Sequence, residues 1–120
     1  MKFKTIENDN ETIAIVISDE KVIIDTQTSI DLLMSAKYDA GTKDIIINKE
    51  CICDDFFILS TGVAGEILQK YKNYGGRLAI YGDFSKYTSK PLKDFIRETN
   101  KGRDFFFVET LEKAIEKLKK

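Results

Sequence analysis

Two hydroxyl side chains and a glycine stand together in the run Ser60-Thr61-Gly62. A hydroxyl near the start of a helix can cap that helix or carry a phosphate group. Apolar residues follow the run at three- and four-residue steps, which is the spacing of one buried helix face. They are Ala64, Ile67, Leu68 and Tyr71. The pattern predicts a helix, expected to be the longest of the chain, with hydroxyl chemistry near its start.

Gly62 and Gly65 break this helical pattern, because each costs a helix about 1 kcal/mol relative to alanine. A local rule broken within a good pattern often marks a functional site. The helix can begin anywhere between Asp54 and Gly62. An early start would bury Ser60 against the sheet, whereas a late start would leave Ser60 as an accessible recognition point.

Acidic and thiol side chains precede this region. Asp54 and Asp55, with Glu50, could hold a hard cation through oxygen ligands, but a solvated loop and helix cap is the favoured interpretation. Cys51 and Cys53 could bind a soft metal, but two thiolates do not complete a tetrahedral site. We therefore expect no metal site and no cofactor.

A second polar segment, residues 82–90, carries Asp83, Ser85 and Lys86 among further hydroxyls and lysines. Such donors could recognise a phosphate or a partner chain. The segment lacks the spacing of a Walker or dinucleotide-binding loop. It is interpreted either as a plain connection between a strand and a helix or as a ligand-binding loop.

The chain contains no histidine, which removes histidine-based nucleophile systems and histidine metal sites. With no constellation of nucleophile and base, we expect a protein that is not an enzyme. The net charge of −1 gives no case for nucleic acid or an anionic membrane as partner. No apolar run approaches the roughly 20 residues of a membrane span, and no signal-peptide core follows the amino terminus. Cytoplasm is the expected location.

Strand and helix patterns alternate after an initial hairpin, which predicts an α/β fold. Strands are expected at 3–7, 12–17, 21–24, 44–48, 77–81 and 104–108. Helices are expected from a cap within 25–29 to Gly41, up to Tyr74, from Ser89 to about Asn100, and over 111–118. The prediction is one domain, 1–120, with a mixed sheet of about five strands, an N-terminal hairpin and about four helices. Ligands and partners would meet the loops at the carboxyl ends of the strands, including 25–29, 49–55 and 82–90.

The run from Phe57 to Val63 resembles the Phe-Ile-Asp-Ser-Ser-Gly-Leu motif of STAS domains, the fold of bacterial anti-sigma factor antagonists, with Leu59 in place of the aspartate. Asp25-Thr26-Gln27-Thr28 is similar to the aspartate loop of that family, and Gly75-Gly76 to its glycine pair. The whole chain more closely resembles a bacterial family, domain-of-unknown-function family 4180. The runs that suggest it are Asp55-Phe56-Phe57, Leu59-Ser60-Thr61-Gly62, Ala64-Gly65-Glu66 and Gly82-Asp83-Phe84.

The STAS resemblance implies a STAS-like, protein-binding regulatory module of the bacterial cytoplasm. In the antagonists a serine of the motif is phosphorylated by a partner kinase, and this serine falls on Ser60. Thr61, Gly62 and the loop residue Asp25 complete the implied recognition point. The expected partner is another protein, with a regulatory kinase among the candidates. The alternative is a small-ligand or nucleotide-binding domain that uses loops 49–55 and 82–90, with Asp54, Asp55, Asp83, Ser85 and Lys86 as the binding side chains.

Overall fold

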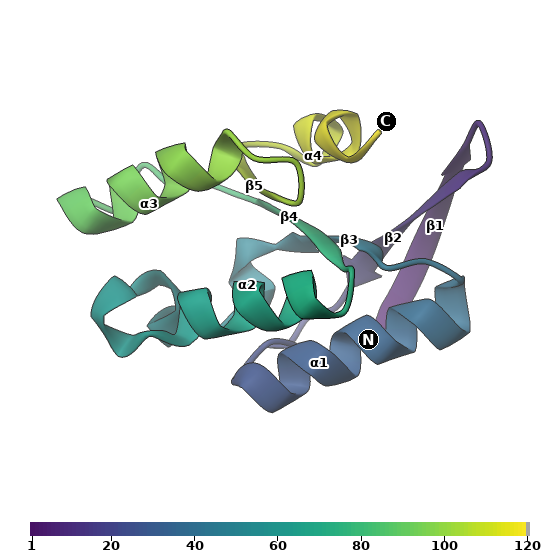
Figure 1. The fold of residues 1–120 in the computed structure, drawn as a ribbon, viewed down its shortest axis with the longest axis horizontal. Helices are drawn as coiled ribbons and strands as arrows, with labels where there is room; N and C mark the ends of the chain where they lie inside the picture. Colours follow the sequence, from purple (N-terminus) through teal and green to yellow (C-terminus); the bar gives the residue numbers. More distant parts are fainter. Residues whose placement is uncertain (120) are drawn as a thin grey trace.

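The fold is built on a mixed β-sheet, seen in a computed structural model that describes residues 1–119 except for the side chain of Asn8 (Figure 1). Within these residues the sheet has five strands in the order β1-β2-β3-β4-β5. The strands are β1 (Lys2–Asn8), β2 (Glu11–Ile17), β3 (Asp44–Asn48), β4 (Arg77–Tyr81) and β5 (Phe105–Val108). The first pair is antiparallel and the other pairs are parallel. The predicted mixed sheet with an N-terminal hairpin is confirmed.

Four α-helices accompany the sheet in the described part of the chain, as predicted. They are α1 (Thr26–Ser35), α2 (Val63–Asn73), α3 (Lys90–Asn100) and α4 (Leu111–Leu118). A π-helical turn, Ala36–Ala40, extends α1 to the predicted C-cap, Gly41, whose φ is 72°. Between residues 1 and 119, every helix is too short or too polar to cross a membrane.

The sequential strand order decides which face of the sheet each helix covers. Crossovers between neighbouring parallel strands are right-handed as a rule, so α1, α2 and α3 belong on one face. Side chains of these helices do share one apolar cluster with the sheet. The helix α4 follows the last strand, and its Ala114 and Leu118 pack in a second cluster on the opposite face. Figure 1 shows α1 and α2 side by side.

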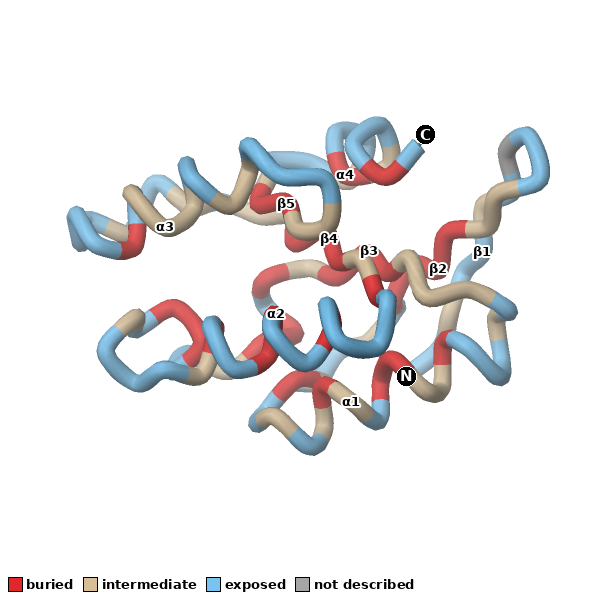
Figure 2. The backbone as a smooth tube through the Cα atoms, viewed as in Figure 1, coloured by how far each residue is buried: buried red, intermediate tan, exposed pale blue. Residues whose placement is uncertain are grey.

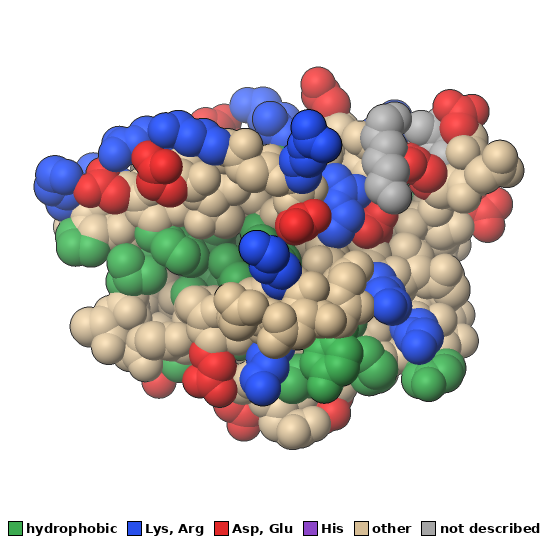
Figure 3. Space-filling view, viewed as in Figure 1, with side chains coloured by type: hydrophobic (Ala, Val, Ile, Leu, Met, Phe, Trp, Pro, Cys, Tyr) green, Lys and Arg blue, Asp and Glu red, His purple; other side chains and the backbone are tan. Residues whose placement is uncertain are grey.

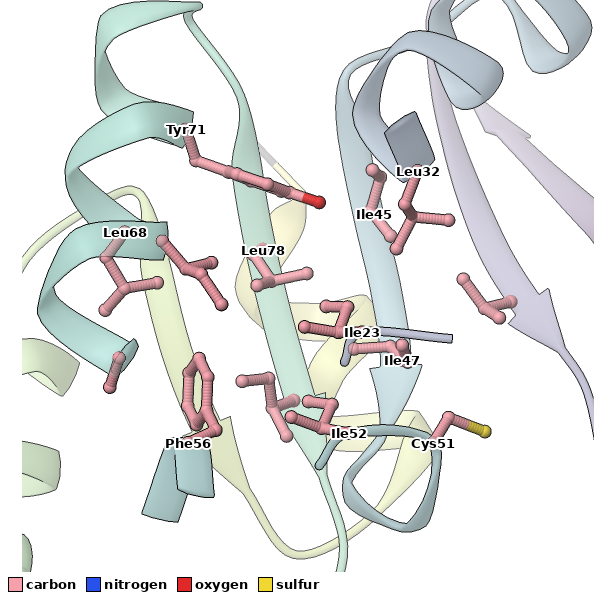
Figure 4. Packing of buried hydrophobic residues seen from close by; sticks show 14 of the residues in the cluster. Ile23, Leu32, Ile45, Ile47, Cys51, Ile52, Phe56, Leu68, Tyr71 and Leu78 are labelled. Atoms are coloured by element: carbon pink, nitrogen blue, oxygen red, sulfur yellow. The ribbon is translucent and has the colours of Figure 1, made fainter. Parts of the chain in front are cut away.

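Successive side chains of each strand point to opposite faces of the sheet, so the strands contribute to both apolar clusters. Ile45 and Ile47 face the first cluster and Ile46 the second, and all three are fully buried. Phe107 and Phe106 divide in the same way, which explains a run of three phenylalanines in β5. Figure 2 shows that buried residues concentrate along the central strands, and Figure 4 shows the first cluster, where α1 and α2 meet β3 and β4.

The predicted strand 21–24 is wrong. The structure holds only an isolated bridge between Ile23 and Ile52. Two backbone hydrogen bonds hold the segment in place. The Val22 N–H donates to the Cys51 carbonyl oxygen, and the Cys53 N–H donates to the Ile23 carbonyl oxygen. The segment lies between a hydrogen-bonded turn at 18–20 and the capped start of α1, so too few residues remain extended to form a ladder.

The helix start, predicted to lie between Asp54 and Gly62, is found at the C-terminal end of that range. Residues Asp54–Phe57 and Leu59–Thr61 form two 3₁₀ turns, and α2 begins at Val63. Gly62 has a φ of 78°, a left-handed conformation that interrupts an α-helix. Residues 54–61 therefore do not form one continuous helix with α2. The expected longest helix is matched in length by α3, since α2 and α3 each have 11 residues.

Candidate functional site

Of the two hydroxyl side chains before α2, that of Thr61 is hydrogen-bonded within residues 1–119 and that of Ser60 is not. The Thr61 hydroxyl lies 2.7 Å from the carbonyl oxygen of Asp55 and 2.8 Å from that of Ile58, to which it can donate. Thr61 therefore fastens the turn to the preceding residues. Ser60 is exposed, and its hydroxyl makes no hydrogen bond to any of residues 1–119. The serine is the side chain of this pair that can react with an external group.

Gly62 is required by backbone conformation. It occupies the N-cap position of α2 with a φ of 78°, and a Cβ added there would meet no atom within 4 Å. Steric freedom around Gly65 is equally large, but Gly65 lies within ordinary helix on the exposed side. Only the first of these two glycines has a structural reason, which is the left-handed turn that places Ser60 ahead of the helix.

Asp25 caps α1. Its carboxylate accepts from the backbone N–H of Thr28 at 2.8 Å and from the Thr28 hydroxyl at 2.9 Å. The Thr28 hydroxyl oxygen in turn accepts from the backbone N–H of Asp25 at 3.0 Å, which completes a capping box. These bonds, the backbone one first, lower the pKa of Asp25 below its usual 3.8. Asp25 is exposed, and its polar contacts are local to α1.

A groove of about 800 Å³ lies beside Ser60, between residues 54–60 and residues 86–92. It brings together three of the residues singled out in the sequence: Asp54, Ser60 and Lys86. Its floor includes the rings of Phe57 and Tyr87, stacked with centroids 5.2 Å apart and planes inclined by 18°. The groove has about twice the volume of the hollow of about 410 Å³ that Asp83 and Ser85 line.

Lys49, at the end of β3, supports the floor of this groove. Its side chain is buried, and its Nζ lies 3.0 Å from the Glu50 carboxylate and 3.5 Å from the Tyr87 hydroxyl. The ammonium also sits 5.2 Å from the centroid of the Tyr87 ring. Burial alone lowers the pKa of Lys49, but the bonds to Glu50 and Tyr87 outweigh it and raise the pKa. A Cβ on Gly82 would come within 2.6 Å of the Lys49 side chain, so glycine is needed for this packing.

Lys49 and Tyr87 lie in the loops expected to meet a ligand, 49–55 and 82–90, but neither was singled out as a binding side chain. The sequence shows a lysine directly after a buried strand and a tyrosine in a polar loop. Both patterns are ordinary at a surface, and the contact joins residues 38 positions apart. A signal was present only in Gly82, a glycine directly after a buried strand.

Asp83 and Ser85 lie apart from the groove. The Asp83 carboxylate accepts from the Ser85 backbone N–H at 2.9 Å and from the Ser85 hydroxyl, and these bonds lower the pKa of Asp83. Both residues line a separate hollow of about 410 Å³. The binding side chains predicted for loops 49–55 and 82–90 are thus divided, with Asp54 and Lys86 in the groove and the Asp83–Ser85 pair outside it.

Asp54 and Asp55 are solvated, as expected, but neither caps α2, because they begin the 3₁₀ turn that precedes it. Asp54 lies 4.0 Å from the Lys21 ammonium. Cys51 and Cys53 are free thiols, and burial raises the pKa of Cys51. Over the described residues, no three His, Cys, Asp or Glu side chains converge closely enough to hold a metal ion.

Comparison with known proteins gives a family and a distant structural likeness. The chain is similar to a crystal structure of a candidate anti-sigma factor antagonist from Thermotoga maritima, with a TM-score of 0.48 and 17% identity over 98% of this chain and 95% of that one. A search of curated proteins finds no match. A family model described as "Domain of unknown function (DUF4180)" matches residues 8–118. The chain belongs to the DUF4180 family, as its sequence runs suggested.

Proposed function

We propose that this chain is a non-enzymatic, protein-binding regulatory module of the anti-sigma-antagonist type, with a single domain over 1–120. Its partner contacts the turn Leu59–Thr61 and the start of α2, and phosphorylation of Ser60 switches the contact. The cytoplasm, where a bacterial kinase and ATP are present, is its proposed location. The resemblance of residues 57–63 to the STAS motif suggests the class.

The observation that carries the proposal is the availability of Ser60. A kinase must reach the serine hydroxyl, and the Ser60 side chain is exposed on a turn ahead of a helix. Its neighbour Thr61 is exposed too, but its hydroxyl already bonds to backbone carbonyls. Modification at Ser60 would leave those bonds of the turn in place.

Electrostatics at this helix end favour a phosphate switch. A phosphoserine carries about 1.5 to 2 negative charges, and the N-terminus of a helix attracts negative charge. The N-cap of α2 is Gly62, which has no side chain to occupy that end. A phosphate on Ser60 would therefore change the charge of the proposed contact surface without unfolding the helix beside it.

Incubation with a purified bacterial serine kinase of the anti-sigma type and ATP, followed by peptide mass mapping, tests the modification. We expect one phosphate, on Ser60. Ser60→Ala should abolish it, whereas Thr61→Val should keep it. An unmodified peptide 54–66, or a phosphate that survives Ser60→Ala, would overturn the switch.

Affinity for that kinase tests the contact surface. We expect Ser60→Asp to weaken the complex at least ten-fold in isothermal titration calorimetry, since a charge at the interface centre is poorly tolerated. Asn73→Asp is the matched control, because it adds the same charge at the other end of α2. Equal losses for both variants would place the contact elsewhere.

A further inference from the structure

We propose that the groove between residues 54–60 and 86–92 binds a small organic anion with a flat apolar body, of which an aromatic carboxylate is the simplest example. The proposal does not depend on phosphorylation of Ser60, although Ser60 forms part of the groove wall. The groove shares Asp54 and Lys86 with the ligand site expected at loops 49–55 and 82–90, but Asp83 and Ser85 do not line it.

The lining of the groove is predominantly apolar. Six of its side chains are hydrophobic or aromatic: Phe57, Ile58, Leu59, Tyr87, Pro91 and Leu92. In Figure 3 hydrophobic side chains gather in the hollow between α3 and the turns that precede α2. Small-molecule sites are concave, mostly apolar and about 300 to 1,000 Å³ in volume. The groove, at about 800 Å³, falls in that range.

Aromatic packing fixes the floor of the groove. Phe57 stacks on Tyr87 and also meets Phe56 edge-on, with ring centroids 5.0 Å apart. Lys49, buried beneath the loop, holds the Tyr87 ring through its ammonium group. Rings held by these contacts give the groove a preformed apolar wall, so a ligand would lose little free energy in ordering the site.

Charge on the groove favours an anion. Two charged side chains line it, Asp54 and Lys86. Asp54 has Lys21 at 4.0 Å, whereas Lys86 has no carboxylate within 4.0 Å in residues 1–119, and Glu50 and Asp83 interact with its charge only at longer range. Lys86, in the part of the groove formed by loop 86–89, is therefore the lining group that would pair with an anion.

Hydroxyl groups complete the polar side of the groove. Ser60, Thr88 and Ser89 all line it. The Ser89 oxygen caps α3 by accepting from the Leu92 N–H at 3.4 Å, which leaves its own proton free to be donated. A carboxylate accepts hydrogen bonds from hydroxyls and ammonium groups but donates none. The combination of Lys86 with these hydroxyls therefore suits a carboxylate better than an amine.

Titration of the isotope-labelled full chain with 2-naphthoate, followed by amide chemical shifts, tests the site. 2-Naphthylmethylamine, with the same ring system and the opposite charge, is the matched probe. We expect shifts confined to residues 54–60 and 86–92, and affinity for the carboxylate at least five-fold higher than for the amine. Equal affinities, shifts centred elsewhere, or no shifts at about 10 mM carboxylate would overturn the proposal.

Two variants separate recognition from folding. Lys86→Gln should lower the naphthoate affinity about three- to ten-fold, the range of a partly exposed charge-assisted bond, while Lys113→Gln on α4 should leave it unchanged. If Lys86→Gln has no effect, anion recognition is wrong. Concentration-dependent shifts of the groove without a probe would show that a second copy occupies it, and would also overturn the proposal. Failure of these tests leaves kinase modification of Ser60 unaffected, so the two proposals fail separately.

Discussion

The starts of α1 and α2 differ in how far side chains of the chain bond to their backbone groups. At α1, Asp25 and Thr28 bond to each other's backbone and side chains, so the polar groups of this helix start are used within the chain. At α2 the cap is Gly62, which contributes no side chain. The Thr61 hydroxyl oxygen accepts from the Val63 N–H at 3.3 Å, and Ser60 is exposed without a side-chain bond to residues 1–119. A closed helix start stabilises its helix, whereas an open one leaves groups for an external partner.

This difference separates residues that the STAS resemblance had placed in one recognition point. Asp25 has a sufficient structural role as the cap of α1, and its lowered pKa follows from that role. Ser60 has no comparable structural role in residues 1–119. An exposed side chain without a structural role is the stronger candidate for function, and the variants below test that division.

The largest expected effect is at the two glycines of α2. Gly62→Ala should lower the free energy of unfolding by about 1–2 kcal/mol, because alanine is strained at a φ of 78°. Gly65→Ala should raise it by up to about 1 kcal/mol, since alanine favours helix and a Cβ there meets open space. Urea denaturation of both variants measures the difference. Effects of the same sign would mean that Gly62 does not form the left-handed turn.

Next in size is Tyr71→Phe, which cuts the bond between the two helices. The buried Tyr71 hydroxyl donates to the carbonyl oxygen of Ser29, in the first turns of α1, at 2.7 Å. Its loss should cost about 1 kcal/mol, because a buried carbonyl loses a partner. Urea denaturation gives the cost, and amide exchange should quicken in both helices. Phe95→Leu on α3 is the control, which should leave exchange in α1 unchanged.

Much of the fold could be predicted from the sequence because it depends on local patterns. The run of β3, a cap within 25–29 and the C-cap glycine Gly41 all act over a few residues, and all appear where expected. The strand at 21–24 failed because a ladder needs a partner of equal length, and Ile52 offers one residue. The start of α2 was unresolved because residues 54–62 suit both an early helix start and the two 3₁₀ turns that they form.

The candidate site was predictable only in part, for a related reason. Ser60 could be singled out because a hydroxyl beside a helix glycine is unusual locally. The groove depends on Phe57 meeting Tyr87, which lie 30 residues apart by their positions. Contacts of that range leave no periodic trace in a single sequence. Lys49 likewise appeared as a surface lysine until folding brought Tyr87 over it.

The acid response of α1 should be smaller than the effects of either glycine or of Tyr71. The pKa of Asp25 is lower in the folded chain than its usual 3.8, so its contribution is present above that pH and is lost as pH falls through the folded pKa. An asparagine at position 25 would keep a side-chain oxygen that can accept the hydrogen bond from the Thr28 N–H, but would carry no charge. Asp25→Asn should therefore lose less stability than the wild type between pH 7 and about pH 3 in urea denaturation. Equal losses would mean that the capping box contributes nothing through its charge.

The smallest expected effect is at Ser60, and it tests the open helix start most directly. Ser60→Ala should change the free energy of unfolding by less than about 0.5 kcal/mol, because the hydroxyl is exposed and makes no bond within residues 1–119. Thr61→Val, one residue away, should cost about 1 kcal/mol, since its hydroxyl holds the carbonyls of Asp55 and Ile58. Urea denaturation of the pair gives the comparison. A Ser60→Ala loss as large as that of Thr61→Val would make Ser60 a structural residue, and the α2 start would then be as closed as the α1 start.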